Sequence, residues 1–236
     1  MLTENQFISQ PDNPAAPVSA WGNPELKLLT SESTGRTQLE KFISKKFYAT
    51  HSAEIDEFMP YLLELKQANQ RRAGLGLRPG VDGNFFLQTY LDKPVEQIIA
   101  GLSRAPCSRD KIVEIGNFAA TGAVVGSILF SVLAKSLLQA GFEWMVFTAT
   151  PKVAKMITHL DCEPTIIGVA NPDKLGDSAL CWGDYYKNNP TVMACQLRQA
   201  IGFAGSNHRT ERIFEEYASD IEQLASTLEW VVRRGL

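Results

Sequence analysis

The sequence predicts a mixed α/β fold, and three observations support this prediction. Residues 111–119 form an apolar, strand-like segment, residues 123–140 a nearly uncharged helix, and residues 144–148 a second apolar strand. Gly141 follows the helix where glycine commonly ends one. Strand and helix patterns alternate again from residue 152 to residue 196. Because a strand, a helix and a second strand in succession form a βαβ unit, we expect a sheet with helices packed on it.

Before residue 111 the apolar patterns are shorter, and local sequence signals predict the helices and strands there. Apolar residues at helical spacing surround Pro60, which kinks or restarts a helix. A run from Pro79 to Gly83 is a strong turn signal between two apolar segments and predicts a hairpin. The expected elements are a strand (39–48), a helix (55–65), two hairpin strands (73–78 and 85–90) and a short helix (95–102).

The ends of the chain differ from its middle. Residues 1–36 are rich in Pro, Asn, Ser and Thr without periodicity, so we expect a flexible leader. After Gly205, apolar residues recur every three or four positions and predict an amphipathic terminal helix. The predicted organisation is therefore a leader (1–36), a folded domain (37–205) and a C-terminal helix (206–236). Within the domain we also expect a helix (152–160) and strands at 165–169 and 191–196.

Composition narrows the class of protein. The chain has 236 residues, 44% hydrophobic and 21% charged, which suits one folded domain with tails. A net charge of -3 argues against a nucleic-acid partner. The four cysteines form no C-x-x-C pair, and none of the three histidines lies near them in a metal-ligand spacing, so we expect free thiols and no metal site. The N-terminus lacks the basic and apolar regions of a secretory signal, so a cytoplasmic location is expected.

A membrane-spanning helix has to be considered because residues 115–134 carry no charged side chain. The segment begins as a strand, however, and contains Asn117, Thr121, Ser127 and Ser131. Its apolar helix is followed at once by an apolar strand, which is ordinary for a helix packed on a sheet. We therefore expect no stable membrane span.

The strand at 112–118 carries one acid, Glu114, and one amide, Asn117, and is followed by small residues. A turn of small residues lets backbone N–H groups approach an anion, and a helix N-terminus attracts one. The segment from Ala119 through Thr121 and Gly122 to Ala123 is therefore predicted to bind phosphate or pyrophosphate.

The order of these elements resembles the GNAT acyltransferase fold, which implies a GNAT-like mixed sheet flanked by helices. The segments FMPYLLEL, AGLGLR, FFLQTYLDKPVE, IVEIGNFA, WMVFTAT and WGDYYKNNPTVMA together resemble the thermostable hemolysin family over about residues 37–200. The strand VEIGNF is also similar to that of acyl-homoserine-lactone synthases and N-acyl amino acid synthases, which take an acyl chain from acyl carrier protein or coenzyme A. The turn after it keeps only the central Gly122 of the motif found in coenzyme-A-binding relatives, so both donors stay open.

The resemblance implies transfer of an acyl group from a thioester to an amine. Backbone N–H groups around Phe118 and Ala119 would hold the thioester carbonyl. Glu114 is expected to orient or deprotonate the amine, or else to form an ion pair with Arg78 or Arg109. Asn117 is expected on the opposite face of the strand, where it binds the pantetheine arm or satisfies backbone groups.

Further residues complete the expected site. Arg78 is a candidate for binding substrate, as are Thr148 and Thr150, although a Thr at the end of a strand is more often a cap, here before Pro151. Tyr185 or Tyr186 would protonate the departing thiolate, and their alternative is aromatic packing in a loop.

Three functions therefore compete. The leading one is an N-acyltransferase of specialised metabolism, with acyl-CoA or an acyl carrier protein as donor, a small amine or amino acid as acceptor, and no permanently bound cofactor. The second is a directly membrane-active hemolysin that uses the helix at 124–138 or the terminal helix. The third is a catalytically inactive module that binds a partner through the terminal helix.

Overall fold

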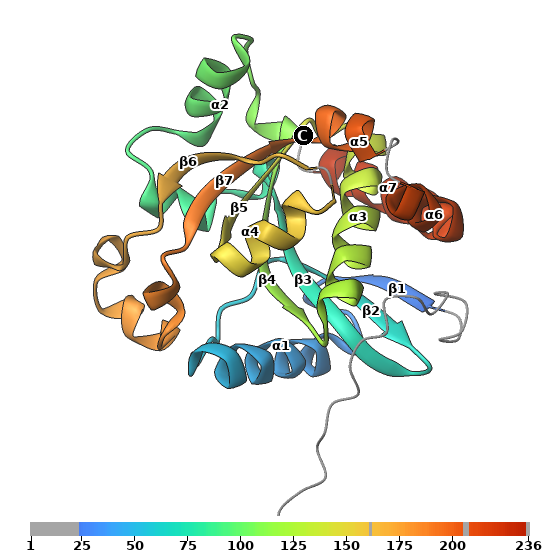
Figure 1. Ribbon diagram of the computed structural model, residues 1–236, viewed down its shortest axis with the longest axis horizontal. Helices are drawn as coiled ribbons and strands as arrows, with labels where there is room; N and C mark the ends of the chain where they lie inside the picture. Colours follow the sequence, from blue (N-terminus) through green and yellow to red (C-terminus); the bar gives the residue numbers. More distant parts are fainter. Residues whose placement is uncertain (1–23, 161, 205–207, 235–236) are drawn as a thin grey trace, which may run out of the picture.

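The computed structural model describes residues 24–160, 162–204 and 208–234. Its centre is a seven-stranded sheet in the order β1-β2-β3-β4-β5-β7-β6 (Figure 1). Neighbouring strands are antiparallel except β4 and β5, which are parallel, so the expected mixed sheet is confirmed. The strands are β1 (Pro24–Leu29), β2 (Tyr61–Gln67), β3 (Gln70–Pro79), β4 (Ile112–Ala120), β5 (Trp144–Ala149), β6 (Thr165–Val169) and β7 (Thr191–Gln196).

Helices cover the sheet. The α-helices are α1 (Arg36–His51), α2 (Val95–Ser103), α3 (Ala123–Gln139), α4 (Pro151–Thr158), α5 (Leu197–Ala204), α6 (His208–Glu216) and α7 (Ala218–Arg234). Short 3₁₀ helices lie in the connections: η2 (Gly80–Asp82), η3 (Phe86–Tyr90), η4 (Arg109–Lys111), η5 (Pro172–Trp182) and η6 (Tyr185–Asn188).

Alternate residues of the sheet bury their side chains on opposite faces. Val113 and Ile115 of β4 belong to the large core that includes most of α3. Ile112, on the other face, packs in a second cluster with residues of η3 and α2. Because side chains alternate along a strand, both faces of β4 are covered and the strand is buried over most of its length.

The predicted βαβ unit is confirmed, with α3 connecting the parallel strands β4 and β5. The apolar helix that raised the membrane question is buried: Leu129, Leu133 and Leu137 have no exposed surface. Among the described residues, no helix combines the length and the hydrophobicity needed to cross a bilayer.

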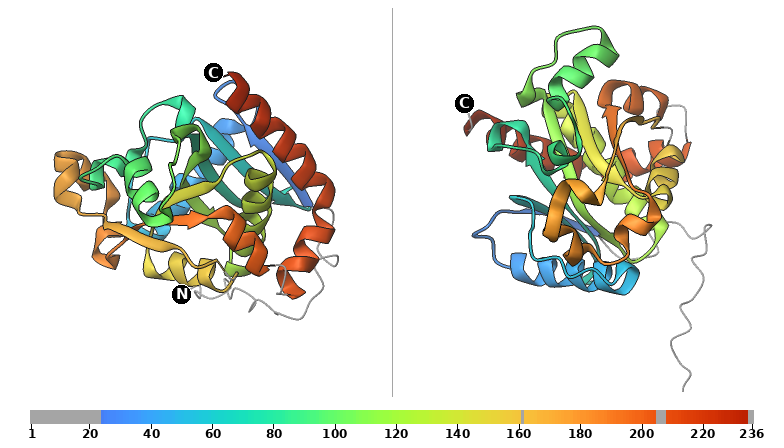
Figure 2. Two further views of the ribbon diagram at one scale, coloured as in Figure 1. Left: turned by 90° about the horizontal axis from the view of Figure 1, so that it is seen from above. Right: turned by 90° about the vertical axis from the view of Figure 1, so that its left-hand side faces the viewer.

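The terminal segment is two helices where one was predicted, because α6 ends and α7 begins on either side of Tyr217. Their apolar faces lie in the same core as α3. Figure 2 (left) shows α7 running beside β1, and the two elements are in contact. Residues 206, 207, 235 and 236 of the expected helix lie outside the described residues.

Several predictions for the N-terminal third are wrong. Residues 24–29, assigned to the leader, form β1 at the edge of the sheet, while residues 1–23 lie outside the described residues. Residues 39–48, predicted as a strand, belong to α1, whose Leu39 and Ile43 are buried one helical turn apart. Residues 61–65, predicted as part of a helix, belong to the strand β2.

The hairpin also differs from its prediction. It joins β2 to β3 through Ala68 and Asn69, whose φ angles are both positive. Such angles are typical of the tight turns between antiparallel strands. Residues 85–90, predicted as the second hairpin strand, instead form η3 and the residue before it.

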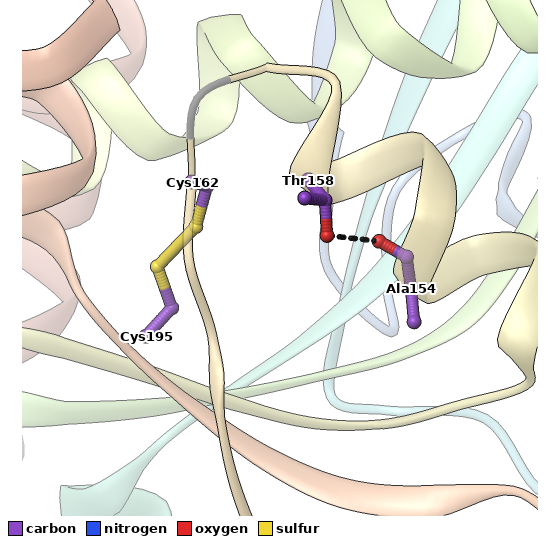
Figure 3. The surroundings of a disulfide bond; sticks show 4 residues. All are labelled: Ala154, Thr158, Cys162 and Cys195. Atoms are coloured by element: carbon purple, nitrogen blue, oxygen red, sulfur yellow. Dashed lines mark hydrogen bonds between the residues drawn. A yellow bond between two sulfur atoms is a disulfide. The ribbon is translucent and has the colours of Figure 1, made fainter.

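Cys162 and Cys195 form a disulfide, so the prediction of free thiols is wrong for this pair. Figure 3 shows the bond between the segment that follows α4 and strand β7. Cys107 and Cys181 are free, as expected.

Candidate active site

The candidate site lies where β4 and β5 diverge. Their parallel pairing covers only Ile112 to Ile115 of β4 and Trp144 to Phe147 of β5, although both strands continue further. Just beyond Ile115, β4 bulges: Gly116 pairs with Gly76 and Ala119 with Gly74, so Asn117 and Phe118 together oppose one residue of β3. Asn117 has a φ of 47°, the left-handed conformation that a bulge requires and that Asn tolerates.

A cavity of about 320 Å³ occupies this divergence. Its walls are mainly aromatic and apolar, and its polar groups gather at a few points, as in ligand-binding cavities generally. Of the residues predicted for the site, the cavity is lined by Arg78, Glu114, Asn117, Phe118, Thr148 and Tyr185.

Glu114 is the buried charge of the site, with only 2% of its surface exposed. Its two carboxylate oxygens accept hydrogen bonds of 2.8 Å from the backbone N–H groups of Phe86 and Leu87, at the start of η3. Burial raises the pKa of Glu114 above its usual value, and these two N–H donors act in the opposite direction. The carboxylate therefore fixes η3 against β4 while it faces the cavity.

Of the two predicted ion-pair partners, Arg78 is the one near Glu114. Its guanidinium lies 3.9 Å from the carboxylate and also donates to the carbonyl oxygen of Asn84 at 2.8 Å. Arg109 instead pairs with Glu96 at 3.1 Å. Arg78 thus places one positive charge at the polar end of the cavity.

Asn117 was predicted to lie on the opposite face from Glu114, and this prediction is wrong because the bulge turns it into the same cavity. Its side chain satisfies backbone groups, one of the two expected roles. The Oδ1 atom accepts from the N–H of Met59 at 3.0 Å, and the Nδ2 group donates to the carbonyl of Glu57 at 3.2 Å. A Cβ on Gly76 would lie 2.8 Å from this Oδ1 atom, so the glycine leaves room for the contact.

The two predicted tyrosines occupy different places. Tyr185 lines the cavity, and its hydroxyl donates to the carbonyl of Thr148 at 3.4 Å. Burial raises the pKa of Tyr185, so its hydroxyl is protonated at neutral pH. Tyr186 is not among the lining residues, and its hydroxyl bonds to that of Tyr90 at 2.5 Å.

The predicted anion-binding turn is not part of the cavity wall. Ala119, Thr121, Gly122 and Ala123 are absent from its lining. The N–H of Thr121 donates to the carbonyl of Arg72 at 2.8 Å. Gly122 is the N-cap of α3 and has no side chain to cap the first N–H groups of the helix.

Thr150 is the N-cap of α4, directly before Pro151, but its side chain makes no capping hydrogen bond. Thr148 lies two residues earlier on β5, and both threonines line the cavity.

Sequence reasoning missed the wall of the cavity formed by α1 and η5. His51, the last residue of α1, and Trp182, the last of η5, both line the cavity. The ring centroids of His51 and Tyr185 are 5.3 Å apart in an edge-on arrangement. His51 lies between a predicted strand (39–48) and a predicted helix (55–65), and Trp182 lies in a predicted loop, so the chain gave no local signal that they would meet.

The mixed sheet, the bulged β4 and the flanking helices define a GNAT-like fold, which this chain shares with known synthases. The AHL synthase LasI matches with a TM-score of 0.54 at 14% identity, over 78% of this chain and 96% of that chain. The N-acyl amino acid synthase FeeM, from uncultured soil microbes, matches with a TM-score of 0.53 at 11% identity, over 77% of this chain and 94% of that chain. BjaI, a CoA-dependent acyl-homoserine lactone synthase in complex with SAM and isopentyl-CoA, matches with a TM-score of 0.50 at 13% identity, over 81% and 90% of the two chains.

The family follows from the sequence itself. The model of the thermostable hemolysin family matches residues 29–201, which is most of the chain. This chain therefore belongs to the thermostable hemolysin family, as its resemblance indicated. None of the curated proteins matches it in sequence.

Proposed function

We propose that this chain is a GNAT-like N-acyltransferase of specialised metabolism, which moves an acyl group from acyl-CoA or an acyl carrier protein to a small amine or amino acid. The observation that carries the proposal is the cavity at the divergence of β4 and β5, which joins an apolar aromatic wall to the buried carboxylate of Glu114. The apolar aromatic wall suits an acyl chain, and the carboxylate of Glu114 suits an amine. The named activities of LasI, FeeM and BjaI support the same chemistry.

The donor would enter along the open edge of β4. Beyond Ile115 the edge of β4 that faces β5 makes no sheet pairing with it, so N–H groups near Phe118 are available to hold a thioester carbonyl. The uncapped start of α3, at Gly122 and Ala123, is a suitable place for the donor phosphate. The acyl donor is a co-substrate in this proposal, and either coenzyme A or a carrier protein can present it.

Glu114 and Arg78 would orient the acceptor at the polar end of the cavity, and Thr148 would contribute a hydroxyl beside them. Tyr185 would protonate the departing thiolate, since its hydroxyl is protonated and lines the cavity. Tyr186 would support this wall through its bond to Tyr90. No covalent enzyme intermediate is needed.

The proposal also accounts for the family's description. An N-acylated amino acid is a surfactant, so the product could lyse cells without a pore in the membrane. Direct lysis, the competing function, would require dye leakage from pure liposomes without any substrate. We expect the protein alone to cause no leakage, because the apolar side of α3 is buried in the core.

The proposal is tested by thiol release from a panel of acyl-CoA and acyl carrier protein donors with amines and amino acids, followed by mass spectrometry of the product. Val153 lines the cavity, so V153W should fill it and reduce transfer by at least about tenfold, because misplaced reactants lose much of their rate. The matched control is V169W, since Val169 is 66% exposed on β6. Wild-type protein that releases thiol from none of these donors would refute the proposal.

A further inference from the structure

His51 is the one histidine in the cavity wall. Its Nδ1 atom is buried and has no hydrogen-bond partner within the described residues. Because Nδ1 has no accessible surface, a molecule bound in the cavity would meet the imidazole through its other ring nitrogen, Nε2.

The end of α1 is held in place by a second segment of the chain. The N–H of Asp184 donates to the carbonyl of His51 at 2.6 Å, and the N–H of Glu54 donates to the carbonyl of Cys181 at 2.7 Å. Gly183 makes this close approach feasible, because a Cβ there would overlap the carbonyl oxygens of His51 and Ser52. The segment 181–184 therefore clamps the backbone that carries the imidazole.

The rings around His51 fix its side chain as well. Tyr185 packs edge-on against the imidazole, with ring centroids 5.3 Å apart, and Phe47 lies on the same helix with its centroid 6.1 Å away. An imidazole held by packing on the wall of a cavity is suitably placed to exchange a proton with a bound molecule.

Burial keeps His51 neutral at pH 7. Burial lowers the pKa of His51 below its ordinary value of 6.5. Asp184 acts to raise the pKa and Lys152 to lower it. Glu114, by contrast, already accepts an N–H bond on each oxygen, so it is better suited to orienting an amine than to removing its proton.

We propose that His51 is the proton acceptor of the transfer reaction, a role that rests on the proposed function. The amine nitrogen forms a bond to the thioester carbonyl carbon, and the carbon–sulfur bond breaks with its electron pair on sulfur. His51 takes one proton from the nitrogen, which becomes strongly acidic as its new bond forms. Tyr185 gives a proton to the thiolate, and the imidazolium returns its proton to the Tyr185 phenolate. The net change is one amide and one free thiol.

The test compares H51Q with wild type at saturating donor and acceptor over a range of pH. We expect the wild-type rate to fall on the acid side, below about pH 6.5, because protonated His51 accepts no proton. H51Q should lose about 100-fold in rate and show a smaller fall on the acid side, since only protonation of the acceptor amine then remains. The matched control is H159Q, since His159 is exposed on the surface at the end of α4 and lies outside the cavity wall.

Two further measurements separate a chemical role from a structural one. Imidazole added to H51A should restore part of the rate, whereas a folding defect would not respond to it. An NMR titration of the histidine rings, independent of activity, should place the pKa of His51 below 6.5, with H51Q assigning the signal.

The outcomes distinguish the two proposals. If wild type transfers acyl groups and H51Q keeps its rate and its acid limb, the role of His51 is refuted and the acyltransferase stands. If the wild-type protein transfers an acyl group from none of the donors, both the proposed acyltransferase activity and the role of His51 are refuted.

Discussion

Asn117 connects the bulge of β4 to the segment before β2, more than fifty residues earlier in the chain. It does so with both ends of its amide, which bond to the backbone of Glu57 and Met59. Its positive φ of 47° costs Asn little, and glycine could adopt it as well. The importance of the residue should therefore lie in its two hydrogen bonds.

N117G is expected to lower the free energy of unfolding by about 1–2 kcal/mol, because it keeps the backbone conformation and removes both bonds. N69G is the matched control, since Asn69 has a similar φ of 60° in the exposed turn between β2 and β3. N69G should change the free energy of unfolding by less than about 0.5 kcal/mol. Urea unfolding of the three proteins measures the difference, and equal stabilities would show that the amide contacts contribute nothing.

The residues of the site were predictable to different degrees. Glu114 could be singled out because a carboxylate in an otherwise apolar strand must find partners, and the structure gives it two N–H donors. The face of Asn117 could not be predicted, because strict alternation along the strand gives the wrong answer wherever a bulge adds a residue. His51 gave no signal in the sequence because its partners come from residues 181–185.

At the scale of elements, the connection from η5 to η6 matters because it closes one wall of the cavity. It is held against the end of α1 by Gly183, whose φ of 50° and ψ of -123° suit only glycine. Gly176, within η5, has a nearly identical conformation with φ of 57° and ψ of -136°. The two glycines differ in their surroundings, because a Cβ on Gly176 would meet nothing within 4 Å.

G183A and G176A should therefore each lower the free energy of unfolding by about 1–3 kcal/mol, because alanine strains the backbone at both positions. G183A should lose further stability and should also slow acyl transfer, because its methyl group displaces the segment from His51. Thermal unfolding and thiol-release rates of both variants measure the two effects. If G176A slows transfer as much as G183A does, the clamp on α1 has no special role.

Elements were predicted well where several signals agreed, and the predictions failed mainly in the N-terminal third of the chain. The run from β4 through α3 to β5 combines an apolar strand, a long uncharged helix and a stop at Gly141, so three signals agree. Residues 39–48 mix buried Leu39 and Ile43 with half-buried aromatics, and so short a segment fits a strand as well as a helix. Tertiary packing on β2 and β4 settles the choice, and it is not visible in one short window.

At the scale of the whole molecule, the terminal helices are part of the core. Leu228 of α7 has no exposed surface and belongs to the same cluster as α3. The third competing function has the terminal helix offer its apolar face to a partner, but α7 already packs on α3 and β1. The helices therefore stabilise the strand edge and the helix that supports the cavity wall.

L228A is expected to lower the free energy of unfolding by about 2–5 kcal/mol, because it leaves a cavity between α7 and α3. The matched control is L180A: Leu180 is 82% exposed, so the same truncation should cost less than about 0.5 kcal/mol. Chemical denaturation compares the two variants with wild type. Equal losses would mean that α7 is not docked in solution. A large loss confined to L228A would show that α7 is docked against α3 and contributes to the stability of the folded chain.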